Sequence, residues 1–158
     1  MPRPLLVSLR VLCATAFSLS CAAIAWHAFA YLYLEYNPRN PFHVSFALTG
    51  WAVPAHFFAA GLALLIAPLQ LSARLRTRWP VVHRSVGWAY LASVSIGGSA
   101  GIVLALHAQG GWHTGSSFLM LAVLWLACSW IGVYHAVGRR FEAHRRWMLR
   151  SIALTFAG

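Results

Sequence analysis

Histidine is the side chain in this sequence with the widest chemical scope. Eight histidines accompany only two acidic residues, Glu35 and Glu142, in a chain of 158 residues. A neutral imidazole binds transition metals and haem iron through one ring nitrogen. His56, His83 and His144 lie within or at the start of long apolar runs. Because polar side chains at such positions are costly and mark functional sites, we take these three as candidate metal- or cofactor-binding residues.

Arginine follows two of these histidines, in the segments "RWPVVHRSVGWAY" (78–90) and "EAHRRWMLRS" (142–151). Arg84, Arg145 and Arg146 could pair with carboxylates such as haem propionates, or with lipid phosphates. Two interpretations of His83 and His144 therefore stay open. In one, the histidines anchor helix ends among lipid headgroups. In the other, they are the paired axial ligands of a b-type haem.

A haem needs space beside each ligand, and small residues follow two of the histidines at one-turn spacing. Gly87 lies one turn after His83, and alanines follow His56 at positions 59, 60 and 63. The partner of His56 would be His27 or His113. With His113, the arrangement resembles the cytochrome b561 type of two-haem membrane protein in its topology and histidine placement, which implies electron transfer involving a quinone or another redox partner.

Other chemistries find little support in the sequence. The two acids cannot form a carboxylate pair for hydrolysis at the membrane centre, because both lie near the ends of apolar segments. A glycine-rich phosphate loop and an HExxH motif are both missing from the sequence, and the histidines lack zinc-site spacing. The arginines lie beside apolar segments rather than on a polar face, which speaks against nucleic-acid binding. We therefore expect no catalytic residues and lean towards a protein that is not an enzyme.

The elements that position these residues are predicted to be transmembrane helices. The chain is 60% hydrophobic and 9% charged, whereas a soluble domain has about 25% charged residues. Apolar segments cover residues of about 5–34, 46–72, 83–106 and 117–137, with loops at "ARLRTRWP" and "GRRFEAHRR". A fifth helix from residue 145 to 158 would span about 21 Å, less than the ~30 Å hydrocarbon core. We expect one all-α polytopic bundle over residues 1–158, with four complete helices, the start of a fifth and a truncated C-terminus.

Arginine placement predicts the orientation of the bundle. All twelve basic residues are arginines, and with alternating helices only Arg39 lies on one side while the rest lie on the other. By the positive-inside rule, the arginine-rich side is cytoplasmic. The prediction is a multi-pass protein of the bacterial inner membrane with a cytoplasmic N-terminus. Gly97 and Gly101 in "GGSAG" have the four-residue spacing that lets membrane helices approach closely.

From about Trp51 to its end, the sequence resembles an uncharacterised family of bacterial multi-helix membrane proteins, a domain of unknown function. The most specific segments are His56 with Gly61, "LR.R.P..HR..G..Y" from Leu75 to Tyr90, and "HRRWM.RS.ALTF" from His144 to Phe156. The resemblance implies a helical membrane fold and favours the same three histidines, and it implies no established activity. Such proteins usually continue beyond this point.

Two functions follow from these observations. The first is a non-redox helical bundle, either structural or binding lipid or another anionic ligand through its arginines and histidines. The second is a b-type haem electron-transfer module, with His83 and His144 as inner ligands and His56 as an outer one. The lipid bilayer is the one partner that both require.

Overall fold

The structure is a computed structural model that describes residues 3–157, and every regular element in that range is a helix. Four helices are long and apolar enough to cross a membrane. They are α1 (Arg3–Tyr31), α3 (Ala52–Leu71), α5 (Pro80–Leu106) and α6 (Gly111–Val137). Three further helices complete the fold: α2 (Pro41–Thr49), α4 (Ala73–Arg78) and α7 (Phe141–Ala157). The expected all-α bundle is thus confirmed.

Several helix boundaries differ from those predicted. The segment expected as one helix from residue 46 is divided at Gly50, whose φ of +53° favours glycine. The expected loop "ARLRTRWP" contains helix α4. Helices α5, α6 and α7 begin earlier than the apolar runs do, at Pro80, Gly111 and Phe141. Apolar periodicity misses these first turns because they hold prolines, glycines and polar residues that extend beyond the hydrophobic segments.

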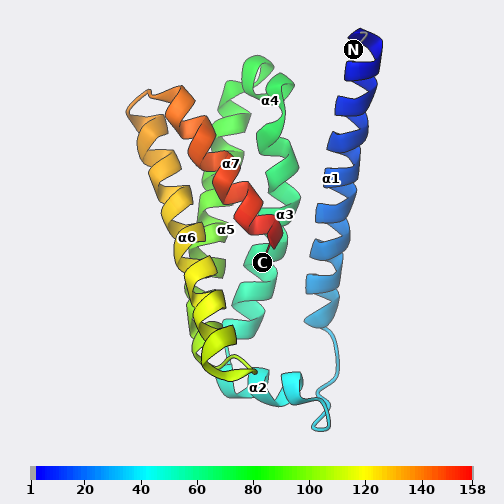
Figure 1. The fold of residues 1–158 in the computed structure, drawn as a ribbon, viewed down its shortest axis with the longest axis vertical. Coiled ribbons are helices and arrows are strands. Elements are labelled where there is room, and N and C mark those ends of the chain that lie inside the picture. The colour runs from blue at the N-terminus through cyan, green and yellow to red at the C-terminus, as the bar shows by residue number, and fades with distance from the viewer. Residues whose placement is uncertain (1–2, 158) are drawn as a thin grey trace.

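The helices run alternately up and down (Figure 1), so that the arginine-rich segments gather at one end. The N-terminal end of α1, helix α4 and the connection from α6 to α7 are at the same end of the bundle, and α2 is at the opposite end with the α5–α6 connection. We call the first of these the basic end. It is defined by Arg10, Arg74, Arg76, Arg78, Arg84, Arg139, Arg140, Arg145 and Arg146. Arg39 precedes α2 at the opposite end.

Close helix packing centres on α5. Helices α3 and α5 form the most extensive pair, and a Cβ at Gly97 would lie 3.3 Å from the backbone nitrogen of Ala60. A Cβ at Gly115 of α6 would lie only 2.8 Å from the carbonyl oxygen of Ala105 on α5. The predicted role of "GGSAG" in close helix approach is therefore confirmed at Gly97.

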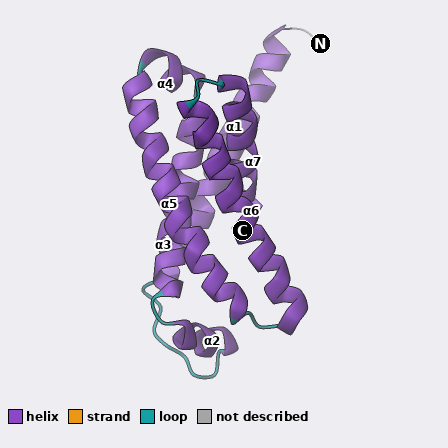
Figure 2. Ribbon diagram, turned by 90° about the vertical axis from the view of Figure 1, so that its left-hand side faces the viewer, coloured by secondary structure: helices purple, strands orange, loops and turns teal. Residues whose placement is uncertain are grey.

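Helices α1 and α7 pack against the α3, α5 and α6 helices through contacts of different extent (Figure 2). Helix α1 contacts α3 through a small buried cluster of Cys21, Ala25 and Leu64, while most of its large apolar side chains are exposed. Helix α7 packs on α6 and also reaches α3. The rings of Phe17 and Phe156 join α1 to α7 with their centroids 5.5 Å apart.

Candidate functional site

The junction of α3, α4 and α5 forms a pocket at the basic end. Ser72 ends α3 and caps α4, because its Oγ accepts a hydrogen bond from the Leu75 backbone nitrogen at 3.2 Å. Trp79 leaves the helical conformation directly before Pro80, as a residue preceding proline tends to do. This sequence of cap, six-residue helix and proline folds the chain back on itself. It also directs the side chains of α4 over the end of α3.

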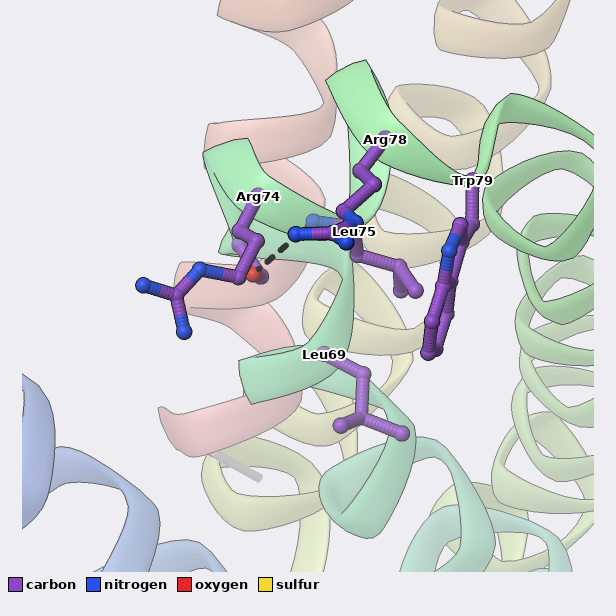
Figure 3. Close-up of a pocket in the computed structure, with 6 residues that line it drawn as sticks. Leu69, Arg74, Leu75, Arg78 and Trp79 are labelled. Atoms are coloured by element: carbon purple, nitrogen blue, oxygen red, sulfur yellow. Dashed lines mark hydrogen bonds between the residues drawn. The ribbon is translucent and has the colours of Figure 1, made fainter.

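The pocket has a volume of about 360 Å³ and combines cationic with apolar lining. Arg74 and Arg78 are four residues apart and so lie on one face of α4. In Figure 3, Arg74 lies on one side of the pocket and the Trp79 ring on the other, with Leu75 between them and Leu69 below. The Leu69 and Trp79 side chains are 51% and 59% exposed, so apolar surface remains open beside the guanidinium groups.

A buried network of polar side chains joins α5, α6 and α7 below the basic end. The Tyr90 hydroxyl lies 2.8 Å from Ser151 Oγ and 2.7 Å from Thr155 Oγ1. Trp125 Nε1 donates to Thr155 Oγ1 at 2.8 Å, and Ser129 Oγ lies 2.7 Å from Ser151 Oγ. Every member has a partner, so the network fixes the position of α7 without leaving a polar group orphaned. We did not predict this network, although the i,i+4 spacing of Ser151 and Thr155 signals two hydroxyls on one helix face.

His144 is held in a defined orientation on α7. Its Nδ1 lies 2.8 Å from the carbonyl oxygen of Gly132 on α6. Since a carbonyl only accepts hydrogen bonds, Nδ1 must donate, and Nε2 keeps its lone pair in the neutral ring. The His144 backbone nitrogen bonds to the oxygen of Arg140, which places the residue in the first turn of the helix rather than in a loop.

His83 occupies the equivalent position in the first turn of α5, where its backbone nitrogen bonds to the Trp79 oxygen. Its side chain lies within electrostatic range of His144 on α7 and of Arg76 on α4. Its Nδ1 is buried and has no hydrogen-bond partner among residues 3–157. The structure therefore brings His83 and His144 into the same region of the basic end.

His56 lies in the other half of the bundle. It is in the second turn of α3, and its Nδ1 lies 2.8 Å from the Gly97 carbonyl oxygen on α5. A Cβ at Gly101 would lie 3.2 Å from the same nitrogen, so this helix face is covered by α5. From His56 to the α3 terminus at Leu71 the helix rises by about 22 Å. His56 and His83 are consequently near opposite ends of the helical bundle.

The surroundings of the remaining candidates are less enclosed. His27 and His113, the two alternatives for pairing with His56, are both exposed. Arg84, Arg145 and Arg146 are also exposed. The space expected beside Gly87 is bordered by Gln70, whose Nε2 donates to the His83 carbonyl oxygen at 3.3 Å. A Cβ at Gly87 would lie 3.4 Å from the Gln70 side chain.

Comparison with known proteins agrees with this membrane architecture. The description "Predicted membrane protein (DUF2306)" belongs to a family whose sequence profile matches residues 53–158, more than half of the 158-residue chain. The chain belongs to the DUF2306 family. The resemblance inferred from about Trp51 onward is thereby confirmed. No curated protein and no solved structure matched the chain in the same comparisons.

The DUF2306 match covers nearly all of α3 and the helices that follow it. It therefore includes the basic-end pocket, the hydroxyl network and the three candidate histidines. Helices α1 and α2 precede the matched residues. Among the described residues, no group of three or more histidine, cysteine or acidic side chains has a metal-binding arrangement. His56, His83 and His144 thus do not form one shared metal site.

Proposed function

We propose that this DUF2306 protein binds an anionic phospholipid at the basic-end pocket and has a non-redox, non-catalytic role. The observation that carries the proposal is the lining of this pocket, where Arg74 and Arg78 stand next to exposed Leu69 and Trp79. Arginine binds phosphate through paired hydrogen bonds. Tryptophan belongs at the membrane interface, where one part of its ring is apolar and another is wet. The pocket therefore offers arginine side chains to a lipid phosphate and apolar side chains to the hydrocarbon next to it.

The proposed orientation follows from the same arginines. The basic end faces the cytoplasm of a bacterial cell, and α2 lies on the outer side of the inner membrane, as the positive-inside rule requires. Anionic lipids give the cytoplasmic leaflet a negative surface potential, which attracts arginine near the membrane. We expect a cysteine introduced at Arg139 to be shielded from an impermeant maleimide in intact cells, and one at Gln109 to be labelled. The reverse labelling pattern would overturn the orientation.

The lipid proposal is tested by competition between headgroups. The protein is purified in detergent with equal amounts of phosphatidylglycerol and phosphatidylcholine of identical acyl chains, and bound lipid is counted by native mass spectrometry. We expect phosphatidylglycerol to be retained in preference, and to be released as salt is raised because charge attraction is screened. Equal retention of the two lipids at low salt would refute the proposal.

A second candidate is a b-type haem electron-transfer module, and one observation favours it. His144 and His56 both donate Nδ1 to a glycine carbonyl, which is how proteins commonly orient a histidine whose Nε2 ligates a metal. His83, with its buried unpartnered Nδ1, lies within electrostatic range of His144. Arg84, Arg145 and Arg146 would then meet the haem propionates, and a quinone or another redox protein would be the partner.

The haem candidate predicts a visible spectrum. Protein from cells grown with ample haem should show the sharp reduced-minus-oxidised band of six-coordinate haem b, and His83→Ala or His144→Ala should remove it. The exposed His113 supplies a control, because His113→Ala would leave a haem bound at the basic end unchanged. A featureless spectrum from a folded preparation would eliminate this candidate and leave the lipid proposal in place.

A further inference from the structure

A second cavity lies between α3 and α5, nearer the middle of the bundle. It has a volume of about 290 Å³, and its lining is almost entirely apolar. Small residues form its floor, with Ala55 and Ala59 on α3 and Ala89 and Ala92 on α5. Large side chains stand at its edges, where Phe58 and Ile96 are 57% and 54% exposed. The cavity is therefore a groove that opens on the outer surface of the bundle.

This groove and the basic-end pocket lie on the same face of α3. Leu62 lines the groove and Leu69 lines the pocket, and residues seven apart lie two turns along one helix face. Leu65 lies between them and is 43% exposed. Helix α1 packs mainly on the neighbouring face of α3, where Phe29 approaches Gly61 and the buried cluster includes Leu64. Helix α1 reaches the edge of the groove, where the ring centroids of Phe29 and Phe58 lie 5.9 Å apart, while Leu65 and Leu69 remain exposed.

The spacing of the two cavities fits the dimensions of one leaflet. From Leu69, which lines the pocket, to Ala59, which lines the groove, α3 rises by about 15 Å at 1.5 Å per residue. Half of the ~30 Å hydrocarbon core is also about 15 Å. A phosphate held by Arg74 and Arg78 would therefore place the end of its acyl chain at the depth of the groove.

We infer that the groove between α3 and α5 holds an acyl chain of the phospholipid whose phosphate is bound by Arg74 and Arg78. The inference rests on the proposed function and adds a binding site for the acyl chain to the proposed binding site for the headgroup. Charge complementarity at the pocket specifies an anionic headgroup, while the largely apolar groove specifies a long hydrocarbon chain. A chain in the groove has protein atoms on several sides, so it gains more close contacts than a chain on a flat helix face.

Filling the groove is the direct test. Ala92 is exposed on the groove floor, so Ala92→Phe adds bulk there without entering the core. Ala127 on α6 is likewise exposed and is outside both cavities, which makes Ala127→Phe the matched control. Retention of dioleoyl and dihexanoyl phosphatidylglycerol is compared by native mass spectrometry. We expect Ala92→Phe to weaken retention of the long-chain lipid about tenfold, the equivalent of removing roughly two methylene groups from contact.

Each outcome separates the groove from the pocket. Retention of the dihexanoyl lipid should be the same in wild type and Ala92→Phe, because its short chains end before the groove. If Ala92→Phe retains the dioleoyl lipid as well as Ala127→Phe does, the groove is empty and this inference is wrong, although the headgroup site stands. If the wild type shows no preference for phosphatidylglycerol over phosphatidylcholine, the proposed function itself fails and the groove assignment fails with it.

Discussion

Exchanging both Arg74 and Arg78 for glutamine is expected to weaken binding of phosphatidylglycerol about 30-fold. Both side chains line the basic-end pocket. Each arginine near an anionic membrane surface contributes about 1 kcal/mol, so two contribute about 2 kcal/mol, or roughly 30-fold in affinity. Glutamine retains hydrogen-bonding capacity and much of the side-chain length, so the change reports mainly on charge. Native mass spectrometry across a lipid titration measures the effect.

The matched control removes the same charge from the same end of the molecule. Arg145 and Arg146 are exposed near the start of α7 and do not line the pocket. The variant Arg145→Gln with Arg146→Gln should retain phosphatidylglycerol nearly as the wild type does. If both double variants lose the lipid equally, attraction is a diffuse property of the basic end. The pocket would then have no special role.

Replacing Tyr90 by alanine is expected to cost about 3–5 kcal/mol of folding stability, as does removing a large aromatic side chain from a core. Tyr90 is fully buried, and its ring packs in the cluster that contains Val94, Trp125 and Ile152. The same change removes the hydroxyl that joins α5 to α7. Unfolding followed by circular dichroism in a mild detergent, with added denaturing detergent, measures the loss.

Tyr90→Phe separates the ring from its hydroxyl. Ser151 and Thr155 keep Ser129 and Trp125 as partners, so no polar group is orphaned. The change removes two interhelical hydrogen bonds, and at an average of ~0.6 kcal/mol each in membranes the cost should be about 1 kcal/mol. Tyr33, which is 88% exposed, supplies a control, since Tyr33→Ala should change stability by no more than about 0.5 kcal/mol. A Tyr90→Phe cost as large as that of Tyr90→Ala would show that the hydroxyl network, rather than the packed ring, holds α7 in place.

The membrane class and the positions of the spanning helices were predictable because a bilayer selects for them strongly. A run of about 20 apolar residues is a signal that few other structures produce. The same logic placed Arg74, Arg76 and Arg78 on the side of the bundle shared with the first turn of α7. Helix α4 was missed because six residues with three arginines show no apolar periodicity, and a cap from Ser72 defines the helix instead.

The candidate site was predictable in part. Depth along the helices follows from residue number, so the sequence placed His83 and His144 at one end of the bundle and His56 in the other half. The expected space beside His56 is occupied by α5, because Gly97 and Gly101 allow the two helices to approach closely. The small residues that suggested room for a cofactor are thus explained by helix packing at this position.

The amino-acid sequence by itself determined that the protein belongs in a lipid bilayer, that it is helical, and that its arginines gather at one end. Each of these properties depends on composition and on order along the chain. Tertiary structure alone decided which side chains meet. Tyr90 finds Ser151 and Thr155, and Leu69 of α3 comes to line one pocket with Arg74 and Arg78 of α4. These contacts depend on helix rotation and on the turn at Ser72, which are set by packing between segments that are distant or irregular in the sequence.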